Sequence, residues 1–263
     1  MPEQLLFDVG LQYLRERITD ETILNHYLNL YDKNQLNSLP ETFERILEHA
    51  KNRQGMPNSI GSLVPLRTIL FDFDPIQVKN HFTSWQEIFL HIQNRHTPPG
   101  IMNILNNRNY WVIFSKSIFS SAKFLSRFNS IQEFKEYCTS FIESNPDIRI
   151  AFALLLSEEI KGFGFALACD FLKEWVSPQF VKPDTHTKDI FIGTNFSERN
   201  DSDFTICRRI IQFANSINQV PYSVDKLFWL IGSGRLHITP QRPDEVRFQS
   251  SKQDFIQLYL ASL

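Results

Sequence analysis

Apolar residues recur mainly at helical spacing in this chain, and few glycines interrupt them. In residues 43–50 the apolar side chains fall at positions i, i+3, i+4 and i+7, which places them on one face of a helix. The same pattern covers residues 111–128, 131–142, 204–217 and 224–231. The sequence has nine glycines, about half the average share, whereas doubly wound sheets and barrels need glycine at many turns. We therefore predict an all-α fold, and residues 68–71 are the best candidate for a strand.

Proline and glycine separate the helical segments. Loops are expected at residues 55–61 and 195–203, and Pro146-Asp147 is expected to interrupt the chain before the next helix. A candidate domain boundary at Pro98-Pro99-Gly100 divides the sequence into residues 1–98 and residues 99–263. The first part reads as a helical region of unassigned role that can pack into the same fold as the second.

Charge and cysteine content exclude several classes of protein. The 27 basic and 29 acidic residues give a net charge of −2, which rules out a globally basic nucleic-acid coat but not a local basic patch. The three cysteines stand far apart, so neither a zinc finger nor a four-cysteine iron–sulfur cluster is expected. His81, His91 and His96 lack the ligand spacing of a metal site, so we expect no metal and no other cofactor. A sparse, odd cysteine count favours a reducing compartment.

Neither a signal peptide nor a membrane helix is expected. Residues 1–10 carry acidic side chains and have no basic region followed by a long apolar run. The purest apolar run covers residues 150–156, far short of the ~20 residues that a membrane helix needs. We expect a cytoplasmic protein, associated with the nucleoid if the source is bacterial.

Residues 160–164, Ile-Lys-Gly-Phe-Gly, lie between two predicted helices at residues 151–159 and 165–175. Two glycines so close together permit a tight hairpin, since each can adopt a positive φ and let another backbone approach. Amides at the start of the second helix then point outward and can bind a phosphate, and Lys161 can add a cation. A simple helix–helix turn would have the same sequence, so the hairpin alone is weak support for function.

Asp184 follows Pro183 at the start of a further predicted helix. An aspartate in this place is well suited to cap the helix. A carboxylate fixed at a helix start is also well placed for catalysis, and the two roles are compatible.

Together these segments resemble the helix–hairpin–helix DNA glycosylase superfamily. Residues 160–164 match its hairpin, with Lys161 where the family has proline, and Ala168 matches its small packing residue. Residues 183–186, Pro-Asp-Thr-His, are similar to its aspartate motif, although the family often has one more residue between proline and aspartate. Residues 221–228 resemble the Pro-Tyr segment of the 8-oxoguanine enzymes, so within the superfamily the chain is most similar to the branch of the 8-oxoguanine and 3-methyladenine glycosylases. The resemblance covers about residues 99–233.

The resemblance implies a fold of two helical lobes with a cleft between them, and an enzyme that cuts the N-glycosidic bond of a damaged or modified base flipped out of duplex DNA. In such an enzyme Asp184 would stabilise positive charge on the sugar, activate water, or do both. Members with lyase activity carry a lysine nucleophile two residues beyond the second glycine, where this chain has Ala166. The resemblance therefore implies a monofunctional enzyme without lyase activity. We expect it to act as a monomer.

The hairpin and the aspartate motif supply the residues expected to contact DNA. These are Lys161, Gly162, Phe163, Gly164, Phe165, Ala166, Lys182, His186 and Lys188. For Lys182 and Lys188 a solvated surface position is the alternative, and for His186 a structural role is the alternative.

Two other functions stay open on the sequence. The chain can be a non-catalytic nucleic-acid-binding module that keeps the hairpin, or a helical interaction protein with a fortuitous motif. Asp184, the proline before it and the segment at residues 221–228 favour the enzyme.

Overall fold

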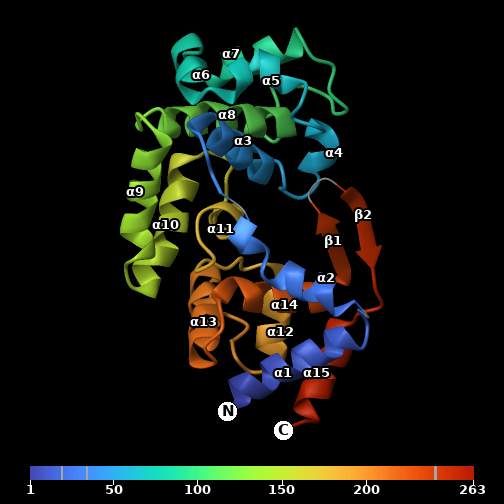
Figure 1. Ribbon diagram of the computed structural model, residues 1–263. Helices are drawn as coiled ribbons and strands as arrows, with labels where there is room; N and C mark the ends of the chain where they lie inside the picture. Colours follow the sequence, from blue (N-terminus) through green and yellow to red (C-terminus); the bar gives the residue numbers. More distant parts are fainter. Residues whose placement is uncertain (19, 34, 240–241) are drawn as a thin grey trace. The chain divides into compact units, whose positions relative to one another are not determined.

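A computed structural model describes residues 1–18, 20–33, 35–239 and 242–263 of the 263-residue chain (Figure 1). Its helices are α1 (Pro2–Arg15), α2 (Glu21–Leu28), α3 (Leu39–Ala50), α4 (Met56–Ile60), α5 (Leu66–Ile69), α6 (Pro75–His81), α7 (Trp85–Gln93), α8 (Tyr110–Leu125), α9 (Ile131–Ile142), α10 (Pro146–Glu159), α11 (Phe165–Trp175), α12 (Thr185–Gly193), α13 (Asp203–Ser216), α14 (Pro221–Ser233) and α15 (Lys252–Leu260). Two short 3₁₀ helices, η1 (Leu30–Lys33) and η2 (Phe71–Phe73), and two strands, β1 (Arg235–Thr239) and β2 (Arg242–Arg247), complete the described elements. The chain is thus helical, as predicted, apart from one antiparallel strand pair.

Local sequence fixes where several helices begin. The sequence Ser-x-x-Glu precedes α3, α7 and α9, and in each case the serine Oγ accepts a hydrogen bond from the glutamate N–H. At α9 the Glu133 carboxylate also accepts from the N–H of Asn129, and at α7 Glu87 accepts from the N–H of Thr83. These reciprocal bonds satisfy N–H groups that a helix start leaves without partners.

Contacts within the chain define two compact units. The first comprises residues 1–34 and 177–263, and the second comprises residues 35–176. The predicted division at residue 98 falls inside the second unit, because α7, before Pro98-Pro99-Gly100, packs on α8 after it. A proline-rich loop therefore marks a turn within the unit. The predicted cleft between two lobes stays a prediction.

In the unit of residues 35–176, α8 is the central helix. It packs against α6 and α7 and also against α3, as Figure 1 shows. Trp111, Phe114 and Ile118 of α8 are fully buried by these neighbours. Burial of side chains this large is the main stabilising term of such a core. Beside α8, α9 and α10 form a pair in which the rings of Phe141 and Phe152 stack 4.3 Å apart.

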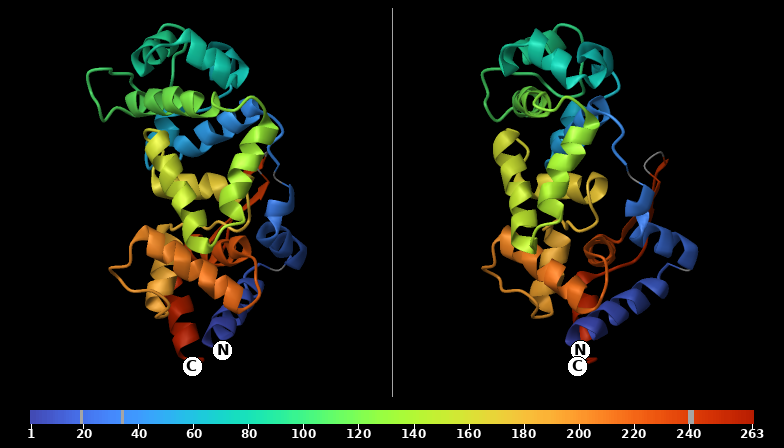
Figure 2. Two further views of the ribbon diagram at one scale, coloured as in Figure 1. Left: turned by 90° about the vertical axis from the view of Figure 1, so that its left-hand side faces the viewer. Right: turned by 60° about the vertical axis from the view of Figure 1, so that its left-hand side comes forward.

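In the other unit, α14 is the central helix. It packs against α1, α2, α12, α13 and α15. The Tyr13 hydroxyl of α1 accepts a hydrogen bond from the N–H of Ser251 just before α15, at 2.9 Å, and so links the first and last helices. The two ends of the chain lie close together in this unit (Figure 2).

Several local predictions differ from the structure. Residues 55–61, expected as a loop, contain the short helix α4. Residues 68–71, expected as a strand, lie in α5 and the start of η2, where φ at Phe71, Asp72 and Phe73 is positive. Pro146 and Asp147, expected to interrupt the chain, form the first turn of α10, where proline loses no hydrogen bond. The β1–β2 pair was not predicted. β1 alternates over only five residues, and β2, with Pro243 and two acidic residues, has one apolar side chain besides the proline and no alternation.

No helix within the described part of the chain is both long enough and apolar enough to cross a membrane.

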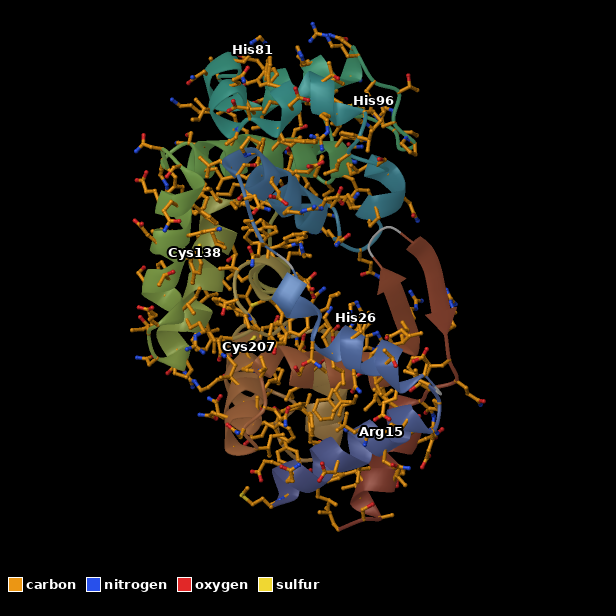
Figure 3. The ribbon with its side chains drawn as sticks, in the orientation of Figure 1. Arg15, His26, His81, His96, Cys138 and Cys207 are labelled. Carbon is orange, nitrogen blue, oxygen red and sulfur yellow. The ribbon has the colours of Figure 1, made fainter. Side chains whose placement is uncertain are left out.

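Cys138, Cys169 and Cys207 are all free and buried, and Figure 3 shows the first on α9 and the third on α13. Burial raises the pKa of the Cys138 thiol to about 12. Because the thiolate is the reactive form, the folded protein should resist iodoacetamide at pH 8, whereas protein unfolded in guanidinium should gain three labels. Mass spectrometry of both samples checks this expectation. Rapid labelling of Cys138 in folded protein would contradict its burial.

Candidate functional site

The hairpin at residues 160–164 joins α10 to α11. Ile160 is the C-cap of α10, and Gly164 is the N-cap of α11. We expected that both glycines could adopt a positive φ, but only Gly162 does, at +85°, while Gly164 has φ −68° in the extended region. The turn therefore requires glycine at position 162, where φ is positive, whereas any residue could adopt the backbone conformation at position 164.

Two serines of α8 hold the hairpin by the peptide groups of Lys161. The Ser117 hydroxyl donates to the Lys161 carbonyl at 2.8 Å, and the Lys161 N–H donates to Ser120 Oγ at 2.9 Å. A Cβ atom on Gly162 would lie 2.8 Å from Ser117 Oγ and from Ile113 Cγ2. The hairpin is thus pressed against α8, with Ile160 and Phe163 buried on either side of Gly162. The sequence analysis missed both serines, because α8 contains two further serines, Ser115 and Ser121, and nothing in the sequence distinguishes the pair that contacts the hairpin.

The outer side of the hairpin presents backbone donors. Within the described residues, the N–H groups of residues 162, 164, 165 and 166 have no hydrogen-bond acceptor. The N–H groups of Phe163 and Leu167, by contrast, donate to the carbonyls of Ile160 and Gly164. Open amides at the start of an 11-residue helix carry the positive end of its dipole. This arrangement is suited to an anion such as a phosphate.

Gly164 keeps the end of α11 accessible. It is exposed, and a Cβ atom built there would meet nothing within 4 Å. Phe165 and Ala166 beside it are partly exposed. Lys161 is also exposed, and its Nζ lies 3.8 Å from the Glu158 carboxylate, a distance typical of a weak surface pair. Its ammonium group is therefore accessible to an anion at the hairpin.

A cluster of buried polar side chains, which includes His49, Asp170 and Lys173, joins α11 to α3. His49 Nδ1 lies 3.2 Å from Asp170 Oδ2, and Lys173 Nζ lies 3.6 Å from Asp170 Oδ1 and 3.4 Å from Glu174. Lys173 is 4% exposed, so its amine is not on the open side of the hairpin. The sequence analysis did not predict this cluster, because His49 and Asp170 are far apart in the chain.

Asp184 caps α12 in the other unit, as predicted. Its Oδ1 accepts a hydrogen bond from the N–H of Thr187 at 2.9 Å. The residue is half-buried and follows an extended segment in which Val181 and Pro183 are buried. One carboxylate oxygen is thus engaged by the helix start. For the second oxygen no partner is found among the described residues.

Three further predicted contact residues lie near Asp184 in the chain. Lys188 forms an ion pair with Asp203, so an acidic side chain already balances its charge. His186 packs under α14, where a Cβ atom on Gly232 would lie 2.4 Å from His186 Cβ, and its Nδ1 is buried without a hydrogen-bond partner among the described residues. This packing favours the structural role for His186. Lys182 is half-buried.

His81 ends α6 and His91 lies on α7, with ring centroids 5.7 Å apart, and Figure 3 shows His81 and His96 in this region. In the described part of the chain, no group of three His, Cys, Asp or Glu side chains is arranged to hold a metal ion.

Comparison of the chain with protein-family models, with curated proteins and with solved structures finds no match. The relation to the helix–hairpin–helix glycosylases thus rests on the motifs at residues 160–164 and 183–186, and it stays a prediction.

The two glycines of the hairpin should differ in their tolerance of alanine. Gly162→Ala forces a side chain into a positive φ and against α8, so we expect it to lower the free energy of unfolding by about 1–3 kcal/mol. Gly164→Ala, with an ordinary φ and open space around it, should change stability little. Denaturant unfolding of both variants measures the difference. Equal stability of the two would show that the hairpin does not press on α8.

Proposed function

We propose that this chain is a DNA glycosylase that hydrolyses the N-glycosidic bond of a damaged or modified base flipped out of duplex DNA. The observation that carries the proposal is the hairpin at residues 160–164, with its open amides at the start of α11, followed in the sequence by the helix-capping aspartate at position 184. The open amides suit a DNA phosphate, and Asp184 supplies a carboxylate whose direction the helix cap fixes.

In this proposal the hairpin binds backbone phosphate and Asp184 acts at the sugar. As the bond between the base and C1′ lengthens, its electron pair leaves with the base and positive charge develops on the deoxyribose ring. A carboxylate near C1′ stabilises that charge. Water then adds to C1′ and its proton passes to Asp184, while the departing base takes up a proton. The products are the free base and an abasic site.

A non-catalytic binding module remains the alternative function. The hydrogen bond from Thr187 to Asp184 explains the aspartate as a helix cap without any chemistry. The alternative therefore predicts DNA binding that is independent of base excision.

Asp184→Asn separates the two functions, because asparagine caps a helix about as well as aspartate but cannot stabilise the sugar cation. We expect this variant to keep its fold and its DNA affinity and to lose base excision by about a hundredfold or more. The measurement uses duplexes that each carry one damaged or modified base, with hot alkali to cleave abasic sites.

Asp20→Asn is the matched control, since Asp20 caps α2 in the same unit through a similar bond to Thr22. This variant should keep wild-type activity. Equal excision by the wild type and Asp184→Asn would exclude the catalytic role of Asp184, and wild-type binding without excision of any base in the panel would favour the binding module.

The position of Ala166 predicts hydrolysis without strand cleavage. Lyase chemistry needs an amine that attacks C1′ and forms a Schiff base, and the residue two places after Gly164 has no amine. Borohydride, which reduces a Schiff base to a stable bond, should therefore trap no protein–DNA adduct. A trapped adduct would contradict this, and its loss in Lys161→Gln would identify the exposed hairpin lysine as the nucleophile.

A further inference from the structure

A basic pocket of about 640 Å³ lies beside the hairpin, within the unit of residues 35–176. Its lining includes the side chains of Arg53, Asn107, Arg108, Tyr110 and Lys116, with Gly162 of the hairpin as part of the wall. The sequence analysis did not single out any of the first five residues. They come from the segment before α4, the loop before α8, and α8 itself.

The charge of this pocket is opposite to that of the chain. Its lining contains three cations and no carboxylate, although the chain has 29 acidic residues and a net charge of −2. Within the described residues, no acidic side chain forms an ion pair with Arg53, Arg108 or Lys116. Three cations gathered without carboxylates repel one another, and an anion relieves this repulsion.

Hydrogen bonds and ring contacts hold the segments that bring the cations together. The Tyr110 hydroxyl donates to the Gln54 carbonyl at 3.2 Å and so ties the segment of Arg53 to the start of α8. Asn109 caps α8 and also donates to the Ile101 carbonyl at 2.9 Å, which holds the loop of Arg108. Lys116 Nζ lies 4.8 Å from the centre of the Trp85 ring. The fold therefore fixes the segments that carry Arg53 and Arg108, and the Trp85 ring holds Lys116 beside them.

We propose that the basic pocket binds backbone phosphates of a nucleic-acid strand that also contacts the hairpin. Gly162, whose N–H group is one of the open amides, belongs to both features, so the pocket adjoins the hairpin. Guanidinium groups bind phosphate oxygens through paired hydrogen bonds, and Tyr110 and Asn107 offer neutral polar groups. Pockets for small metabolites are mostly apolar and enclose their ligand. This pocket is polar, since Ile113 is the one aliphatic side chain in its lining, and it is open to solvent at Arg53 and Arg108, which are exposed. This lining favours a strand over a free metabolite.

The inference extends the DNA-binding part of the proposed function and does not depend on the chemistry at Asp184. Each phosphate contact that is lost should make the salt dependence of DNA affinity shallower by about one unit in the slope of log Kd against log salt concentration. The triple variant Arg53→Gln, Arg108→Gln and Lys116→Gln should therefore lose about two to three units of slope. The probe is an undamaged fluorescein-labelled duplex, and anisotropy gives Kd at several KCl concentrations.

A second triple variant controls for net charge. Lys79, Lys123 and Lys135 are exposed, belong to the same unit, and lie outside the pocket lining. Their replacement by glutamine should leave the slope unchanged. Circular dichroism checks that both triple variants are folded. If the pocket variant is not, the double variant Arg53→Lys with Arg108→Lys, which preserves the charge, should keep the wild-type slope. Each single Gln variant of the pocket should then lose about one unit of slope.

Wild-type slopes in the folded pocket variants, or equal losses in the control, would overturn the proposal. Competition with inorganic phosphate at constant ionic strength distinguishes a nucleic-acid strand from a free phosphate compound as the ligand. If low-millimolar phosphate displaces the duplex from the wild type but not from the pocket variant, the pocket binds a free phosphate compound, and the proposal that it binds a strand is wrong. The glycosylase proposal is tested separately, since Asp184→Asn affects excision and the pocket variant affects affinity for undamaged DNA.

Discussion

The hydrogen bonds between α8 and the peptide groups of Lys161 are the constraint on which the candidate site depends. Ser117 and Ser120 engage the carbonyl and the N–H of one residue, so they fix both its position and its orientation. The direction of the next peptides follows, and with it the outward direction of the open amides. Because Gly162 has no side chain, α8 can approach closely enough for these bonds to form. The packing of α8 thus determines whether the hairpin can bind an anion.

The sequence predicts this structure well where the signal is local. The helices predicted at residues 131–142 and 165–175 coincide with α9 and α11, and the helix cap at Asp184 is as predicted. Failures occur where local and tertiary preferences differ. The β-branched and aromatic residues at 68–71 favour a strand by propensity. Ile69, however, is buried at the end of α5 and Leu70 in the turn that follows, because packing of apolar side chains outweighs a weak intrinsic preference.

The site was only partly predictable for a similar reason. Motif spacing identifies the hairpin, since its residues are adjacent in the chain. The basic pocket is built from positions 53, 108 and 116, which have no fixed spacing, and the sequence around each has no unusual charge. Likewise, the pairing of His49 with Asp170 depends on α3 packing against α11. Such groupings follow from tertiary contacts and cannot be read from periodicity.

The net charge of −2 is compatible with DNA binding for a physical reason. At physiological ionic strength the Debye length is about 8 Å, so exposed carboxylates farther away than this contribute little to the potential at the site. What matters is the local charge. It comes from the cations of the basic pocket, the dipole of α11, and the ammonium group of Lys161, which the exposed carboxylate of Glu158 offsets in part. An acidic chain can therefore carry a local surface that attracts phosphate, while its remaining carboxylates disfavour non-specific binding of DNA elsewhere on the protein.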